Sequence, residues 1–152
     1  MLTIYIDADG CAVKDETYKV ADRYKLAVVV VANKPLTVPL SERISMQTVS
    51  GGFDSADDWI VEQIGLGDIL ITSDLPLADR AIKKRARVIG SKGRELDEEN
   101  IGNALGGREL SAHLRDLGNK NTGPAAMGKA DRSQFLSKLD QICNAIIREH
   151  RK

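Results

Sequence analysis

The sequence predicts an α/β fold with a doubly wound, mainly parallel sheet of about five strands, helices on both faces and a C-terminal helix. Two observations lead to this prediction. Short apolar runs, mostly β-branched, alternate along the chain with longer segments whose apolar residues recur at helical spacing. Residues 28–31 are all valine, which is typical of a strand buried on both faces of a parallel sheet.

The predicted strands are the short apolar runs, and they cover residues 2–7, 26–32, 44–50, 68–73 and 86–90. Amphipathic stripes predict helices that begin near Val13, near Asp54 and near Pro76, since proline is favoured at the first position of a helix. Residues 33–43 contain two prolines and predict an extended loop where a helix would otherwise connect two strands.

The C-terminal third is predicted to be helical with one break. Residues 96–117 have a helical pattern that three glycines interrupt, which indicates two short helices or one kinked helix. Residues 118–130 predict a mobile loop, and residues 131–150 a helix whose apolar face is buried against the rest of the domain or in a homodimer. The length of 152 residues favours one domain over residues 1–152.

Composition indicates a globular protein without a membrane segment. No apolar run approaches the roughly 20 residues that a membrane helix requires, and the first residues pass directly into a strand pattern rather than a signal peptide. Cys11 and Cys143 have neither metal-binding nor disulfide-framework spacing, so we expect reduced thiols and a cytoplasmic location.

The formal net charge is zero, but the charges are unevenly distributed along the chain. Residues 54–79 contain seven acids and no Lys or Arg, whereas residues 80–94 contain seven bases and no acid. An acidic metal site beside a basic phosphate-binding track would give this pattern, and so would two solvated helix faces.

Carboxylates follow the predicted strands. Asp7 and Asp9 end the first strand and Asp74 ends a later one, while Asp54, Asp57 and Asp58 open a helix. In a parallel sheet the carboxyl ends of the strands share one edge. Two carboxylates 4 Å apart repel by about 4 kcal/mol at an effective dielectric constant of 20, so such a cluster must bind protons or a cation. Because the chain has two histidines and neither is near these motifs, oxygen ligation by acids points to Mg²⁺ or Mn²⁺.

Several of these acids also have a structural interpretation. Asp9 could cap the helix that begins near Val13, and Asp54 with Asp57 resembles a capping box. The hydroxyls of Thr72 and Ser73 with Asp74 could cap the helix at Pro76, or could bind a metal and orient water.

Five strings in this sequence are similar to those of a known bacterial family. They are IYIDADGC at residues 4–11, VVVVAN at 28–33, GFDSADDWIVE at 52–62, ITSDLPLA at 71–78, and Gly123-Pro124 with Asp131, Arg132 and Phe135. Together they resemble the YaiI/YqxD proteins, which are classed with the PIN-like nucleases. The resemblance implies a PIN-like domain whose acids at the strand ends hold Mg²⁺ or Mn²⁺ and hydrolyse phosphodiesters, usually in RNA. It implies Asp7 as the first-strand acid, Asp54, Asp57 or Asp58 as the helix acid, and Asp74 as the later strand-end acid.

The resulting hypothesis is a metal-dependent phosphodiesterase, or nuclease, that acts on RNA or single-stranded nucleic acid. Asp7, Asp9 and Asp74 are the candidate catalytic residues, and Thr72, Ser73 and Asn33 are expected to orient the metal ligands. The candidate metal ligands are Asp7, Asp9, Asp54, Asp57, Asp58 and Asp74. The candidate contacts to the nucleic-acid backbone are Arg80, Lys83, Lys84 and Arg87.

Three other functions fit part of the pattern. A haloacid-dehalogenase-type phosphatase would use Asp7 and Asp9 in a nucleophile loop, but it requires later acids that the basic stretch lacks. A receiver-like phospho-switch would use Asp54 as phosphoacceptor, with Thr72 and Lys92 as responding residues, which leaves Asp74 without a role. The third is a non-catalytic module that binds nucleic acid without cleaving it.

Overall fold

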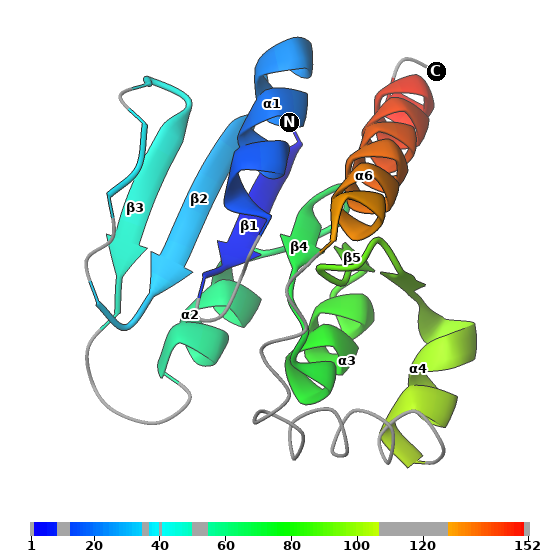
Figure 1. Cartoon of the computed structure of the whole chain (residues 1–152). Helices are drawn as coiled ribbons and strands as arrows, with labels where there is room; N and C mark the ends of the chain where they lie inside the picture. The colour runs from blue at the N-terminus through cyan, green and yellow to red at the C-terminus, as the bar shows by residue number, and fades with distance from the viewer. Residues whose placement is uncertain are drawn as a thin grey trace.

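The computed structural model describes residues 2–8, 13–34, 37–39, 41–49, 55–106 and 128–150. Within them, a six-stranded sheet has the order β3-β2-β1-β4-β5-β6 (Figure 1). The strands are β1 (Thr3–Asp7), β2 (Ala27–Ala32), β3 (Ile44–Thr48), β4 (Ile69–Ile71), β5 (Arg87–Ile89) and β6 (Glu95–Leu96). β1 to β5 are parallel, and β6 pairs antiparallel with β5.

The chain order reverses at the centre of the sheet. From β1 the chain adds β2 and β3 on one side, and it then returns to place β4 and β5 on the other side. β1 therefore lies between β2 and β4, with Ile4 opposite Val28 on one neighbour and opposite Ile69 on the other. In open α/β sheets, ligands bind outside the carboxyl ends of the strands at such a switch point.

Helices cover both faces of the sheet. α1 (Lys14–Tyr24) and α6 (Lys129–His150) lie side by side on one face, and α2 (Ser55–Gln63) and α3 (Leu75–Lys83) cover the other, with α4 (Glu98–Gly106) packed on α3 (Figure 1). Alternation along the strands divides the core: Ile4 and Ile6 pack toward α1 and α6, while Tyr5 packs toward α2.

The two helices of the first face run parallel to one another. Arg132 Nη1 lies 2.8 Å from Glu16 Oε1, and about two turns further along both helices the Tyr24 hydroxyl donates a hydrogen bond to Asp140. α6 therefore starts at the same end of the sheet as α1. Its apolar face, including the fully buried Phe135, packs against the chain's own sheet. This burial covers the stripe on which the expectation of a homodimer was based.

The sequence-based prediction of the fold class is confirmed. The structure adds β6 to the five predicted strands, and its two residues are too few to give an apolar pattern. It also corrects the start of the C-terminal helix, which begins at Lys129 rather than at residue 131. The described part of residues 33–43 contains no helix, as predicted. The predicted helical residues 107–117 and most of the predicted mobile loop, residues 118–127, lie outside the described residues. None of the described helices combines the length and the apolar character needed to cross a membrane.

Candidate active site

The carboxyl ends of β1 and β4 meet through one buried hydroxyl. Asp7 is the last residue of β1, and because Ile6 lies opposite Ile71, Thr72 emerges from β4 beside it. Thr72 Oγ1 donates a hydrogen bond of 2.7 Å to Asp7 Oδ2. Thr72 is only 2% exposed and Asp7 is half-buried, so this hydrogen bond to a carboxylate is partly shielded from water.

The same hydroxyl also contacts Asp74. The Asp74 amide donates to Thr72 Oγ1 at 3.0 Å, so that Thr72 bridges the Asp7 carboxylate and the backbone of Asp74. The Asp74 carboxylate caps α3, since its Oδ1 accepts a hydrogen bond of 3.0 Å from the amide of Leu77. The structure thus establishes the capping role of Asp74, and it also brings Asp74 next to Asp7.

The N-termini of two helices make the electrostatic potential at this edge more positive. α1 follows β1 and α3 follows β4, so the first turns of both helices lie at the carboxyl edge of the sheet. The amino end of a helix carries about half a positive charge, which stabilises nearby carboxylates and anionic ligands. This field stabilises carboxylates at the edge, and it favours an anion such as a phosphate over a cationic substrate.

The turn between β5 and β6, from which sequence analysis named Lys92 only for the receiver-like alternative, also lies at this edge. The side chain of Ser73 is exposed, and its Oγ is 3.2 Å from Oγ of Ser91, which lies in this turn. The turn is closed by hydrogen bonds from Gly93 N to Gly90 O and from Gly90 N to Arg94 O. The signal was present in the sequence, because Ser-Lys-Gly at residues 91–93 follows the predicted strand 86–90, whose carboxyl end must lie at the same edge.

The acids of α2 are placed differently from one another. Asp57 is half-buried, whereas Asp58 is exposed and its Oδ1 lies 2.9 Å from Arg80 Nη2 on α3. Asp58 thus has a partner that sequence analysis had assigned to nucleic acid. Asp9 and Asp54 lie outside the described residues.

Two further observations concern the predicted metal site. In the described part of the chain, no three His, Cys, Asp or Glu side chains are grouped so that they could hold a metal ion. Asn33, predicted to orient the ligands, directly follows β2 and is exposed.

The predicted backbone-binding cations do not gather around Asp7. Lys83 and Lys84 lie at the far end of α3 from its Asp74 cap, and Arg87 begins β5 at the amino edge of the sheet. Three of the four cations are paired with acids of the chain: Arg80 with Asp58, Lys83 with Asp79 at 3.0 Å, and Arg87 with Glu95 at 2.9 Å.

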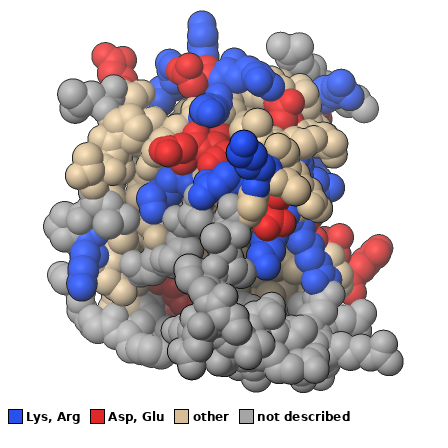
Figure 2. Space-filling view, viewed as in Figure 1, with Lys and Arg blue, Asp and Glu red and all other residues tan. Residues whose placement is uncertain are grey.

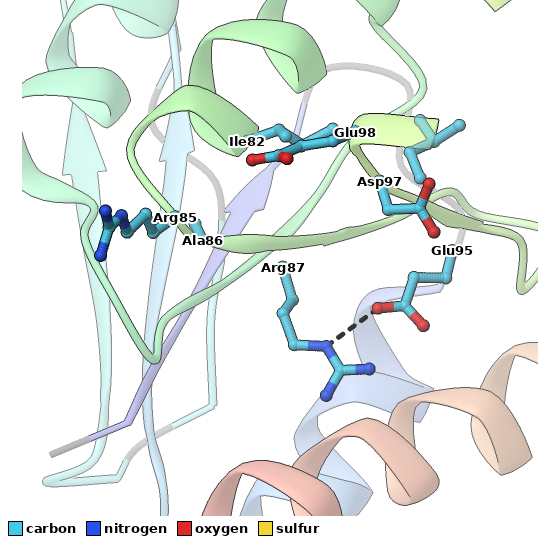
Figure 3. A pocket seen from close by; sticks show the side chains of 8 residues that line it. Ile82, Arg85, Ala86, Arg87, Glu95, Asp97 and Glu98 are labelled. Atoms are coloured by element: carbon cyan, nitrogen blue, oxygen red, sulfur yellow. Dashed lines mark hydrogen bonds and ion pairs between the residues drawn. The ribbon is translucent and has the colours of Figure 1, made fainter. Parts of the chain in front are cut away.

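A cavity of about 430 Å³ lies near this amino edge, between the start of β5, β6 and the start of α4. Figure 3 shows Arg87 and Glu95 pointing toward one another, whereas Arg85 points away from them. Asp97, also in the lining, caps α4 by accepting hydrogen bonds from the amides of Glu99 and Asn100. These contacts stabilise the fold, and the cavity contains none of the predicted catalytic residues.

The outer face over α1 and α6 carries both positively and negatively charged side chains. Figure 2 shows basic and acidic side chains interspersed on it. Two ion pairs join the helices of this face, Arg132 with Glu16 and Arg23 with Asp140. An alternating surface of this kind produces little long-range attraction for a polyanion. Nucleic acid is therefore not expected to bind to this face.

Comparisons with known proteins agree on one family. The model of a family described as "Uncharacterized BCR, YaiI/YqxD family" matches residues 5–145. A UPF0178 protein of Caulobacter sp. strain K31 is 50% identical over 140 residues, which are 92% of this chain and 93% of that protein. A UPF0178 protein of Rhodospirillum centenum is 49% identical over 152 residues, which are 97% of this chain and 99% of that protein. A UPF0178 protein of Paramagnetospirillum magneticum is 51% identical over 142 residues, which are 93% of this chain and 94% of that protein. The comparison with solved structures found no match. The chain therefore belongs to the YaiI/YqxD family.

Proposed function

We propose that the protein is a divalent-metal-dependent phosphodiesterase that acts on RNA or other single-stranded nucleic acid, as a PIN-like nuclease would. One observation carries the proposal: the carboxylate of Asp7 and the backbone of Asp74 are joined through the buried hydroxyl of Thr72 at the switch point of the sheet. This is the position at which open α/β sheets bind ligands. RNA as the substrate is in keeping with the cytoplasmic location expected from the sequence.

The donors at this position suit a hard divalent cation. Asp7 and Asp74 offer carboxylate oxygens from neighbouring strand ends, and Mg²⁺ and Mn²⁺ prefer such ligands to nitrogen or sulfur. Of the other ligands predicted from the sequence, Asp9 and Asp54 lie outside the described residues, while Asp57 is half-buried on α2 and Asp58 is paired with Arg80. When bound, the metal would lower the pKa of a coordinated water and neutralise charge on the scissile phosphate.

The protein's own groups would position that chemistry. Thr72 fixes the orientation of the Asp7 carboxylate, because its hydroxyl donates to Oδ2 and is itself held by the Asp74 amide. The bond from Leu77 N fixes the Asp74 carboxylate in the same way. Side chains held by such bonds need little reorganisation when substrate binds, which favours catalysis.

Digestion of a mixed RNA pool with Mn²⁺ or Mg²⁺ tests the proposal. Asp7→Asn should lower cleavage by more than about 100-fold, since even groups that only orient metal ligands typically contribute 10- to 100-fold. Asparagine keeps an oxygen that can accept the Thr72 hydrogen bond, so the variant should fold, and circular dichroism checks this. Asp22→Asn, which removes an exposed carboxylate paired with Arg43 on the outer surface, is the matched control and should cleave like wild type.

The outcomes separate the enzyme from its alternative. Metal-dependent cleavage that Asp7→Asn abolishes supports the phosphodiesterase. Cleavage that survives Asp7→Asn indicates a contaminating nuclease and contradicts the proposal. RNA binding without cleavage, unaffected by chelation of metal, instead favours a non-catalytic nucleic-acid-binding module.

A further inference from the structure

The turn between β5 and β6 lies beside the proposed catalytic edge. Two contacts place it there: Ser91 Oγ is 3.2 Å from Ser73 Oγ, and Thr72 N donates to Ile89 O at 3.2 Å. Ser73 stands between Thr72 and Asp74 in the sequence. Lys92 is the next residue of the turn after Ser91, so the topology brings its positive charge to this edge from β5.

The turn is held firmly against α6. Gly93 has φ of +90°, and a Cβ added to it would lie 2.9 Å from backbone atoms of Gln134 and Phe135. Only glycine allows so close an approach of the turn to the α6 backbone. Together with the two hydrogen bonds that close the turn, this contact restricts the backbone on which Lys92 is carried.

The charge of Lys92 is available to a ligand. Its side chain is exposed, and within the described part of the chain it takes part in none of the ion pairs. Arg80, Lys83 and Arg87 are, by contrast, already neutralised by acids of the protein. A phosphate that binds to Lys92 displaces no internal partner, whereas binding to the other three would break an existing ion pair.

We infer that Lys92, together with the hydroxyls of Ser73 and Ser91, binds a backbone phosphate of the nucleic-acid substrate beside the phosphodiester held at Asp7 and Asp74. The inference rests on the proposed function. A lysine ammonium is a compact charge with three donors, and two adjacent hydroxyls can donate to the remaining phosphate oxygens. Contact with phosphate rather than with a base gives affinity without reading sequence.

Equilibrium binding of a short fluorescein-labelled oligouridylate, measured by anisotropy at several salt concentrations, tests this contact. For single strands, each phosphate neutralised contributes about 0.7 to the slope of log K against log salt. Lys92→Ala should therefore reduce that slope by about 0.7 and weaken binding at low salt. Lys19→Ala, which removes an exposed lysine in the middle of α1, should leave the slope unchanged.

A second pair of variants tests the hydroxyls. Ser73→Ala with Ser91→Ala removes both Oγ atoms but no charge, so it should weaken binding while leaving the salt slope as in wild type. The thermal stability of all these variants is measured as well. Loss of the fold would weaken binding, but it would not produce the specific reduction in salt slope that is expected for Lys92→Ala.

The results distinguish this inference from the proposed function. An unchanged slope for Lys92→Ala, in a protein that still cleaves RNA in an Asp7-dependent manner, overturns the phosphate contact alone. An equal loss of slope for Lys19→Ala also overturns it, since the effect would then reflect net charge. Wild-type protein that neither binds nor cleaves the oligouridylate overturns the inference and the proposed function together.

Discussion

Replacing Thr72 with valine should destabilise the protein by about 2.5–4 kcal/mol, although the two side chains have nearly the same shape. Thr72 is 2% exposed, and its hydroxyl makes two hydrogen bonds, one to the Asp7 carboxylate and one from the Asp74 amide. A hydrogen bond to a charged group contributes about 1.5–3 kcal/mol, and an ordinary one about 1 kcal/mol. Because valine fills the same volume, no cavity adds to this cost.

Thr17→Val is the matched control for this prediction. Thr17 is also fully buried, but its hydroxyl donates to the backbone oxygen of Val13, at 2.9 Å. That oxygen also accepts from the amide of Thr17 at 3.1 Å, so it keeps a partner after the substitution. Thr17→Val should therefore cost less than about 1 kcal/mol.

Urea denaturation followed by the fluorescence of Trp59 measures both variants. Trp59 is the single tryptophan, and its ring packs edge-to-face on Tyr5 at 6.4 Å, so its emission should report on the packing between α2 and β1. If Thr72→Val costs no more than Thr17→Val, the bridge between Asp7 and Asp74 does not hold in solution. The proposed preorganisation of the two acids would then be refuted.

Two further predictions concern glycine and cysteine. Gly93→Ala should lower the free energy of unfolding by more than about 2 kcal/mol, because Gly93 has positive φ and the new Cβ would overlap the backbone of α6. Gly102→Ala, at a position with open space on α4, should raise it by roughly 0.5–1 kcal/mol, and equal urea midpoints for the two variants would contradict this. Burial, with a smaller contribution from Asp140, raises the pKa of the Cys143 thiol to about 12. In a Cys11→Ser background, Cys143 should therefore react with iodoacetamide at pH 8 only after unfolding, and rapid labelling of the folded protein would contradict the buried position.

The parallel sheet could be predicted because its signal is local. Val28 and Val30 pack toward α1 and α6, while Val31 packs toward the other face, as a continuous valine run in a doubly covered strand requires. The meeting of Asp7 and Asp74 was equally predictable, since parallel strands present their carboxyl ends at one edge. Here the sequence determines the arrangement without knowledge of any contact between distant residues.

The ion pairs could not be predicted in the same way. Residues 80–94 contain no acid, so their charges appear unopposed along the sequence. In the structure the partners come from other elements: Asp58 from α2 pairs with Arg80, and Glu95 from β6 contacts both Arg87 and, from α6, Lys138. Such pairing depends on how helices and strands pack, which charge counting over a window does not detect.

The bases at the start of residues 80–94 also have a structural role at the C-terminal end of α3. Lys83 is in the last turn of α3 and Lys84 is its C-terminal cap, where cations stabilise the negative end of the helix dipole. Asp74 occupies the opposite end of the same helix and caps its free amides. One helix thus separates acid from base by its full length, with the acid at the carboxyl edge of the sheet and the bases near the amino edge.

This separation determines where a nucleic-acid substrate would have to be held. A phosphodiester at Asp7 and Asp74 lies at the carboxyl edge, so bases at the far end of α3 would contact the backbone only at a distance from the reacting phosphate. Lys92, carried to the same edge as the acids by the turn after β5, can contact a phosphate close to it. Salt dependence that is lost with Lys92 but retained in an Arg87→Ala variant would therefore place the substrate across the strand ends rather than along α3.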